Sequence, residues 1–290
     1  MERKAIIPIL LISLVTAPLV LAACIFDDSE EEKWDAAKVC PETGTNAYGM
    51  PNRGTFTDER DGNVYRYTTI GDQVWMAENL RFELSALYSV CYGMEYCYPK
   101  NRGLADTAIT CVKDTASLAD IAQRMQSTCT DNDCIAREFC DKFGRYYAFN
   151  DREPDKIFSW LLNRDIVDSV CPKGWHLPTK AEWIALGESV ENEYLRLTSD
   201  DARYTDTVYR EVGSDDCGFS ALRGGSIGGK THRGGALYEA FSAGYYWVAP
   251  AGNQNFVERI VFVTTVDPFG PDSDFLSSIR CVKDPINSEL

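Results

Sequence analysis

The chain has 290 residues, a formal net charge of −15, eleven cysteines and only two histidines. The acid excess argues against a nucleic-acid-binding protein, because such proteins present a basic surface to the phosphates. Two histidines leave little material for a zinc site or a Ser-His-Asp relay. Many cysteines in a chain of this size indicate an oxidising compartment and disulfides.

The first residues have the pattern of a secretory signal. Arg3 and Lys4 precede an uncharged stretch that ends in Leu21-Ala22-Ala23-Cys24, and a basic start, an apolar stretch and small residues are the parts of a signal peptide. The last four residues resemble a bacterial lipobox, which implies cleavage after residues 1–23 and a lipid on Cys24 as the membrane anchor. An uncleaved transmembrane anchor is the alternative.

Residues 24–52 are predicted to form an acidic tether. The run Asp27-Asp28-Ser29-Glu30-Glu31-Glu32 follows Cys24 closely, and dense like charges repel one another and stay solvated. The run also resembles the acidic tract that directs some bacterial lipoproteins to the outer face of the outer membrane. We therefore expect a lipid-anchored, surface-exposed envelope protein.

Short strands with turns between them are predicted next. Residues 55–57, 64–70 and 73–76 are rich in β-formers, and turns at Asp61-Gly62 and Gly71-Asp72 separate them. This pattern predicts an antiparallel β-meander.

The middle region, residues 84–140, carries six cysteines. Leu118, Ile121, Ala122 and Met125 recur at helical spacing, which predicts a short amphipathic helix. Because the region contains no CxxC pair, we expect a disulfide-stapled insertion and no zinc ribbon.

A second helix is predicted to begin at Thr179. Thr179 and Glu182 have the spacing of a capping box, and an apolar stripe follows it, formed by Trp183, Leu186, Val190 and Tyr194. The remainder is rich in glycine and aromatic residues and ends in two β-rich stretches, 256–263 and 278–282. Few helices, short strands and long loops predict an α+β domain.

Several stretches, in order, resemble the Fibrobacter succinogenes major paralogous domain family, over residues 53–285. They are Gly71-Asp72-Gln73-Val74-Trp75-Met76-Ala77-Glu78-Asn79-Leu80, Cys140-Asp141-Lys142-Phe143-Gly144-Arg145-Tyr146-Tyr147, Cys171-Pro172-Lys173-Gly174-Trp175-His176-Leu177-Pro178-Thr179, Gly218-Phe219-Ser220-Ala221-Leu222 and Ser278-Ile279-Arg280-Cys281-Val282-Lys283-Asp284. Members of this family are mostly secreted or lipid-anchored envelope proteins.

A more distant likeness is to the C-type-lectin-like fold, in particular to its formylglycine-generating, sulfatase-modifying branch. The stretches that carry it are Leu177–Trp183, Arg223–Ser226 and Arg280–Val282. The likeness implies an α+β fold of short antiparallel strands, few helices, long loops and disulfides, with the two ends of the domain in one sheet.

These resemblances also imply disulfide partners. The lectin-like fold implies Cys171–Cys281, and the family implies Cys91–Cys140. The insertion cysteines 97, 111, 129 and 134 are then expected to pair among themselves, which leaves Cys40 and Cys217 as a fifth pair.

An enzyme is not the expected function. Sulfatase-modifying chemistry depends on a reactive cysteine pair shortly before the terminal Arg-Cys strand, and no cysteine stands between Cys217 and Cys281. His176, in a Trp-His-Leu-Pro turn, and His232, in a glycine-rich loop, are expected to be structural or solvated.

A calcium site is one possible reading of a late acidic loop. Asp267, Asp272 and Asp274 offer carboxylate oxygens, the ligands of a hard cation. An acidic surface turn is the other reading, and we favour it because the spacing constrains little. No other cofactor is expected.

Aromatic residues near the C-terminal strands suggest a binding surface. Tyr245 or Tyr246, whichever faces outward under strand alternation, is the candidate to contact a sugar. Arg223 is the candidate to contact an acidic ligand, unless it pairs with a neighbouring acid. The tryptophans are expected to lie in the core, namely Trp75, Trp175, Trp183 and Trp247.

The function predicted from the sequence is therefore a surface binding or adhesion module, with polysaccharide or envelope proteins as partners. A purely structural envelope protein and an enzyme derived from the sulfatase-modifying scaffold are the alternatives.

Overall fold

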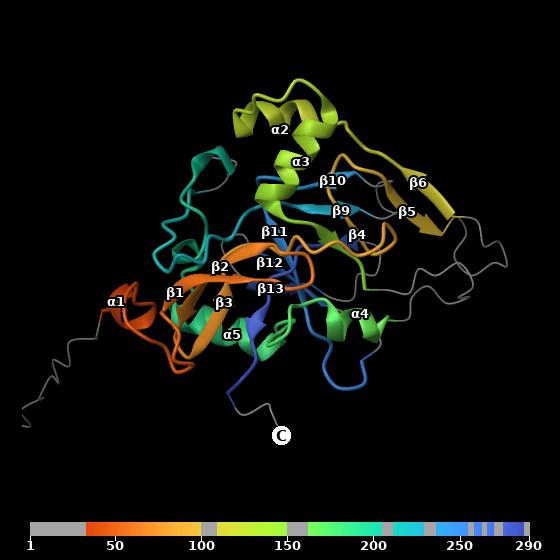
Figure 1. The fold of residues 1–290 in the computed structure, drawn as a ribbon. Helices are drawn as coiled ribbons and strands as arrows, with labels where there is room; N and C mark the ends of the chain where they lie inside the picture. The colour runs from red at the N-terminus through yellow and green to blue at the C-terminus, as the bar shows by residue number, and fades with distance from the viewer. Residues whose placement is uncertain are drawn as a thin grey trace, which may run out of the picture. The chain divides into compact units, whose positions relative to one another are not determined.

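The computed structural model describes residues 33–99, 109–149, 162–204, 211–228, 236–254, 258–262, 266–269 and 275–286. It confirms the predicted β-meander. Strands β1 (Arg53–Thr57), β2 (Val64–Ile70) and β3 (Gln73–Met76) pair antiparallel in succession. The late strand β15 (Val282–Lys283) pairs with β3 and with β8 (Trp175–His176). The sheet order is thus β1-β2-β3-β15-β8, and Figure 1 labels its first three strands, β1, β2 and β3.

The other described strands form four small antiparallel sheets. Two have three strands and two have two strands. They are β10-β9-β14, with bounds Leu237–Tyr238, Ser226–Gly228 and Phe275–Leu276; β11-β12-β13, with bounds Gly244–Val248, Glu258–Phe262 and Val266–Phe269; β4-β7, with bounds Ser89–Val90 and Tyr146–Tyr147; and β5-β6, with bounds Tyr96–Pro99 and Ile109–Val112.

Both predicted helices are present. Helix α2 (Leu118–Met125) buries Leu118, Ile121 and Met125. Helix α5 (Lys180–Ser189) begins with the complete capping box of Thr179 and Glu182. Of the expected stripe, Trp183 and Leu186 lie on α5, whereas Val190 is its C-cap and Tyr194 lies on a short 3₁₀ turn, and all four are buried.

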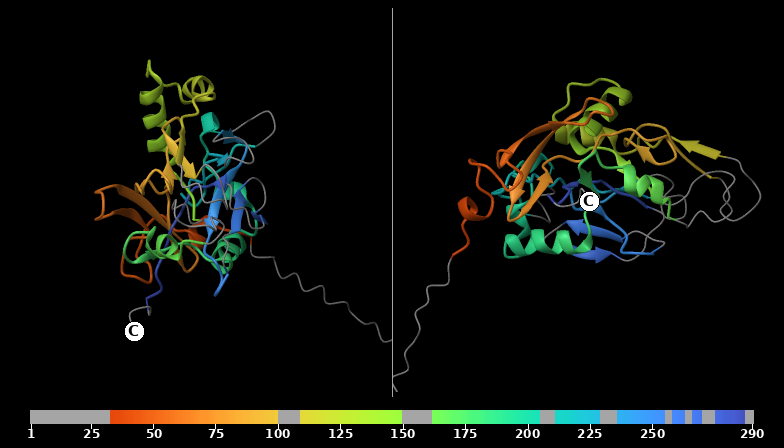
Figure 2. Two further views of the ribbon diagram at one scale, coloured as in Figure 1. Left: turned by 90° about the vertical axis from the view of Figure 1, so that its right-hand side faces the viewer. Right: turned by 60° about the horizontal axis from the view of Figure 1, so that its bottom comes forward.

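Helix α3 (Asn132–Phe143) was not predicted from the sequence. Its N-cap Asp131 accepts a hydrogen bond from the Cys134 amide, and it buries Ile135, Phe139 and Phe143 against the core. It packs on α2 at one end of the folded unit, and α5 lies at the other end (Figure 2). The two remaining α-helices of the described segments are short, α1 (Ala36–Val39) and α4 (Arg164–Ser169), and no helix in these segments has the length and apolarity of a membrane span.

Five disulfides join the described cysteines. Cys171–Cys281 and Cys91–Cys140, the two pairs that the resemblances imply, are both present. The insertion cysteines pair among themselves, as Cys97–Cys111 and Cys129–Cys134, and Cys40 is bonded to Cys217.

The N-terminal boundary of the domain lies earlier than predicted. The compact unit begins at Trp34, so residues 34–52 belong to it and are not tether. Cys40 is buried at 1% exposure and bonded to Cys217, and the Arg53 guanidinium donates to the Cys40 and Asp216 carbonyls (3.3 and 3.1 Å). Aromatic and cysteine packing therefore extends the fold upstream of the family-like motifs.

The fold class is α+β, with short antiparallel strands, few helices and disulfides, as expected. The first strands and the last strand share one sheet, and Cys171–Cys281 ties the start of β8 to β15. The four tryptophans assigned to the core are all buried. Trp75 on β3 and Trp183 on α5 pack with ring centroids 4.8 Å apart, which joins the sheet to the helix.

A fully buried arginine links the late segment to two earlier ones. Arg280 has no solvent exposure, and its Nε donates to Oδ1 of Asn79 (2.8 Å). Its two other nitrogens donate to the main-chain carbonyls of Phe219 and Ser220. Burial of a charge is costly unless hydrogen bonds compensate it, and these three acceptors provide that compensation.

Asn79 extends this network to α3. Its Nδ2 donates to the carbonyl of Phe143 (2.8 Å), the last residue of the helix. Gly144 follows at φ +77°, and a Cβ there would lie 2.7 Å from Asn79 Cβ and 2.8 Å from the Leu80 carbonyl oxygen. Only glycine fits this close approach.

Replacement of Asn79 by alanine is expected to lower the free energy of unfolding by about 2–3 kcal/mol, because it leaves a buried guanidinium N–H and a buried carbonyl without their partner. Urea denaturation of the oxidised protein measures this. Asn132→Ala, at an exposed position of α3, is the control and should change stability by less than about 0.5 kcal/mol. Equal effects of the two substitutions would contradict the role given to Asn79.

Candidate functional site

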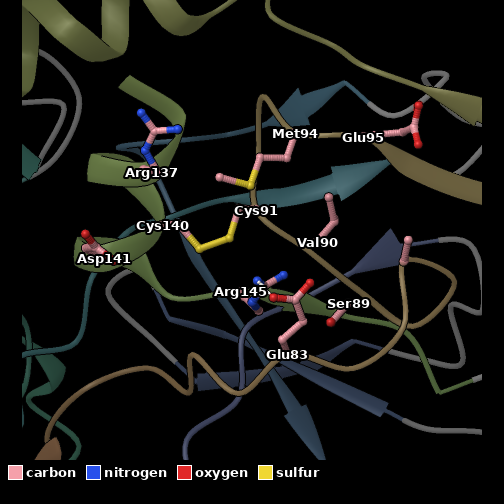
Figure 3. Close-up of a pocket in the computed structure, with 11 residues that line it drawn as sticks. Glu83, Ser89, Val90, Cys91, Met94, Glu95, Arg137, Cys140, Asp141 and Arg145 are labelled. Atoms are coloured by element: carbon pink, nitrogen blue, oxygen red, sulfur yellow. Dashed lines mark hydrogen bonds and ion pairs between the residues drawn. A yellow bond between two sulfur atoms is a disulfide. The ribbon is translucent and has the colours of Figure 1, made fainter. Parts of the chain in front are cut away.

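A pocket of about 390 Å³ opens beside α3. Its walls come from two segments: residues 83–95 around β4, and α3 together with Arg145 (Figure 3). This volume lies in the range of about 300–1,000 Å³ that is typical of small-ligand sites.

The floor of the pocket is apolar and rigid. The Cys91–Cys140 disulfide crosses it, with Val90 on one side and Met94 above (Figure 3). Val90 and Cys91 are at most 2% exposed. Because the disulfide joins the β4 segment to α3, it fixes the spacing of the two walls.

The rim carries charges of both signs. Glu83, Glu95, Arg137 and Asp141 are exposed, and Arg145 is largely covered, with 15% of its side chain exposed. Arg145 Nη2 donates to Oε2 of Glu83 (2.5 Å), and the two side chains meet below the disulfide in Figure 3.

The end of α3 places Arg145. Gly144 lets the chain turn tightly past Asn79, and the Arg145 amide then donates to the Leu80 carbonyl (3.0 Å). Arg145 is thereby brought beside Glu83, three residues further along the segment from Leu80. On α3 itself, Arg137 and Asp141 are four residues apart and share one face.

The expectation that Tyr245 or Tyr246 faces outward is wrong. Tyr245 is 6% exposed and Tyr246 is fully buried, because packing covers both faces of β11. The Tyr246 ring lies 5.7 Å from that of Trp183, and its hydroxyl donates to the Leu222 carbonyl (3.0 Å). The Tyr245 hydroxyl donates to the carboxylate of Glu239.

Arg223 does not offer an exposed cation either. Its side chain is 2% exposed in the core, so it is not placed to receive an acidic ligand from solvent. The whole stretch Arg223–Ser226 is buried. A Cβ on Gly224 would lie 3.1 Å from the Phe143 ring and 3.2 Å from the Tyr146 hydroxyl, so there is little room for a side chain there.

Several predicted sites fall outside the described residues. These are Cys24, His232, Asp272 and Asp274, and of Asp267 only the backbone, in β13, is described. One group of metal-ligand residue types lies within the described segments, Glu95, Cys97 and Cys111. Its two cysteines form a disulfide, so they are not thiolate ligands.

His176 lies between two carboxylates. Its Nδ1 and Nε2 lie 2.8 Å from Asp284 Oδ1 and Glu182 Oε1 respectively. Glu182 also receives hydrogen bonds from the Thr179 amide and hydroxyl through Oε2. With both ring nitrogens engaged, His176 ties β8 to the start of α5 and to the residue after β15, as expected of a structural histidine.

These contacts shift two pKa values in opposite directions. Burial alone would lower the pKa of His176, but the hydrogen bonds and charges of Glu182 and Asp284 outweigh it, and the pKa is raised. Burial alone would raise the pKa of Glu182, but the hydrogen bonds from His176 and Thr179 outweigh it, and the pKa is lowered.

Comparisons with known proteins agree with the sequence motifs. The model of the Fibrobacter succinogenes major domain matches residues 68–283. The chain belongs to this family. The match begins within β2, so it leaves out β1 but covers the rest of the main sheet, the pocket, α5 and the Arg280 network. Neither the curated proteins nor the solved structures gave a match.

Within this Fibrobacter succinogenes major domain, the His176 contacts predict a pH dependence. Protonated His176 donates to both carboxylates, and a raised pKa means that this stabilisation is complete below the ordinary value near 6.5 and is lost as pH rises through the higher folded value. The contribution of Glu182 to stability has the opposite pH dependence. Because its pKa is lowered in the folded protein, this contribution is present at neutral pH and is lost only as the pH falls through the lowered folded value.

Urea denaturation from pH 5 to pH 9 should therefore show a fall in stability above about pH 6.5 that is absent in His176→Gln. A parallel pH profile for the variant and the parent protein would contradict this assignment.

Proposed function

We propose that this protein is a lipid-anchored envelope protein that acts as a surface binding module, with polysaccharide as its ligand. The observation that carries the binding role is the pocket beside α3, which combines an apolar floor with a charged rim. Small-ligand sites typically show this combination of apolar lining and a few placed polar groups. Membership of an envelope-associated family supports the cellular setting.

The chemistry of the rim favours binding over catalysis. Its carboxylates and guanidiniums supply acceptors and donors for hydroxyl groups. His176 lies in a different part of the fold, with both ring nitrogens bonded to carboxylates. The pocket cysteines are joined as a disulfide, so neither is a thiolate nucleophile.

A structural role in the envelope is the second candidate. The five disulfides and the buried Arg280 network make the domain resistant to opening. A structural role predicts stable association with other envelope proteins, which chemical crosslinking detects, and it requires no ligand in the pocket.

The binding role is tested on an array of polysaccharides with the full chain in detergent. The parent protein should be retained by at least one polysaccharide, and Arg145→Ala should weaken that retention about tenfold or more, since a charge-assisted hydrogen bond is worth about 1.5–3 kcal/mol.

Lys180→Ala is the matched control, because Lys180 forms an exposed ion pair with Glu258 and does not line the pocket. It should bind like the parent protein. Retention by no polysaccharide would refute the proposed ligand, and equal losses in both variants would refute the pocket as the site.

The lipid anchor has its own test. Cys24→Ser removes the sulfur to which the lipid would be attached, so the parent protein should incorporate radiolabelled fatty acid and the variant should not. Equal labelling of the two proteins, or no labelling of the parent, would contradict the lipid anchor.

A further inference from the structure

We propose that the pocket beside α3 selects neutral sugars with adjacent hydroxyl groups, and that the Glu83–Arg145 ion pair is the element that recognises them. This inference rests on the proposed polysaccharide-binding function and names the class of ligand for the same site.

The ion pair is a preformed receptor for two adjacent hydroxyls. The bond between Arg145 Nη2 and Glu83 Oε2 uses one of the two carboxylate oxygens and one of the five guanidinium N–H groups. The pair therefore keeps an acceptor beside a donor. A hydroxyl both donates and accepts, so one hydroxyl of a vicinal diol donates to Glu83 while its neighbour accepts from Arg145.

The position of Arg145 is fixed before a ligand arrives. The Arg145 amide is bonded to the Leu80 carbonyl, and 15% of the side chain is exposed. A rigid arginine loses less conformational entropy on binding than a mobile surface side chain does. Glu83 is 72% exposed, so it can adjust to the ligand while Arg145 holds the geometry.

The floor suits the flat face of a sugar ring. Met94 is partly exposed in the pocket and offers its sulfur and methyl group, whereas Val90 and the Cys91–Cys140 disulfide beside it are buried and support it from below (Figure 3). A pyranose presents C–H groups on its faces and hydroxyls at its edge, so the ring lies against the sulfur and methyl groups while its hydroxyls reach the rim.

The charge of the pocket selects against acidic glycans. Three carboxylates, Glu83, Glu95 and Asp141, outnumber the guanidiniums of Arg137 and Arg145, and the whole chain carries −15. A polyanion would therefore be repelled both at long range and on contact. A neutral ligand meets no such penalty.

The test compares soluble polymers of equal length in affinity electrophoresis with the full chain in detergent. The polymers are a neutral glucan, the same glucan with its hydroxyls methylated, and a polyuronate. We expect the neutral glucan to bind, and the methylated glucan and the polyuronate to bind about tenfold more weakly or worse.

Two variants assign the effect to the ion pair. Glu83→Gln keeps the size of the side chain but removes the charged acceptor, and it should weaken glucan binding about tenfold. Glu258→Gln alters a partly exposed carboxylate in an ion pair with Lys180, outside the pocket, and should leave binding unchanged. Thermal unfolding of each variant shows whether it is folded.

The outcomes separate the two proposals. Binding of the polyuronate or the methylated glucan as tightly as the neutral glucan overturns the selectivity for neutral diols but leaves polysaccharide binding intact. Glucan binding that Glu83→Gln does not change overturns the role of the ion pair. Binding of no polymer here and no retention by any polysaccharide on the array overturn the proposed function itself.

Discussion

The guanidinium of Arg280 is the interaction on which the described domain most depends. A cation without solvent exposure is tolerated only when its donors are satisfied, and its acceptors come from Asn79, Phe219 and Ser220. Three segments far apart in the sequence must therefore meet around one side chain. Asn79 links this network to α3, because its Nδ2 also donates a hydrogen bond to the carbonyl of Phe143, the last residue of the helix. The position of Arg145, and with it one wall of the pocket, thus traces back to a charge in the core.

Aromatic packing and disulfides also stabilise the fold, in different parts of it. Trp75, Trp183 and Phe219 pack together between the sheet and α5, and burial of large aromatic side chains is a major source of stability. Within the insertion, two disulfides, Cys97–Cys111 and Cys129–Cys134, close short loops covalently. Cross-links of this kind reduce the freedom of the unfolded chain, which suits a segment that projects functional groups around a small core.

Local patterns in the sequence predicted much of the fold. Alternating β-formers with Asp-Gly turns identified the meander, and the capping box identified the start of α5. Helix α3 was not predicted, because the cysteines of this region, Cys134 and Cys140 among them, indicate a disulfide-stapled insertion. Its helical pattern is nevertheless present, since Asp131 is a helix N-cap residue and Ile135, Phe139 and Phe143 recur every fourth position. The pocket was missed for another reason. Glu83 and Arg145 are 62 residues apart, and only the turn at Gly144 brings them together. The prediction that Tyr245 or Tyr246 faces solvent was wrong because strand alternation gives an outward face only where one side of a strand meets water. Strand β11 is buried on both sides.

The bond between Cys40 and Cys217 has a mechanical consequence. It closes a ring over a sequence separation of 177 residues, and the pocket residues lie inside that ring. A pull on the N-terminal end of the folded unit reaches Cys40 before it reaches β1. At Cys40 the force divides between the chain that leads to β1 and, through the disulfide, the chain at Cys217. The hydrogen bonds between β1 and β2 therefore do not carry the whole force. In the lipid-anchored binding module proposed above, force between the membrane and a bound ligand would pass through this covalent loop, and the hydrogen bonds of the edge strand β1 would carry only part of it.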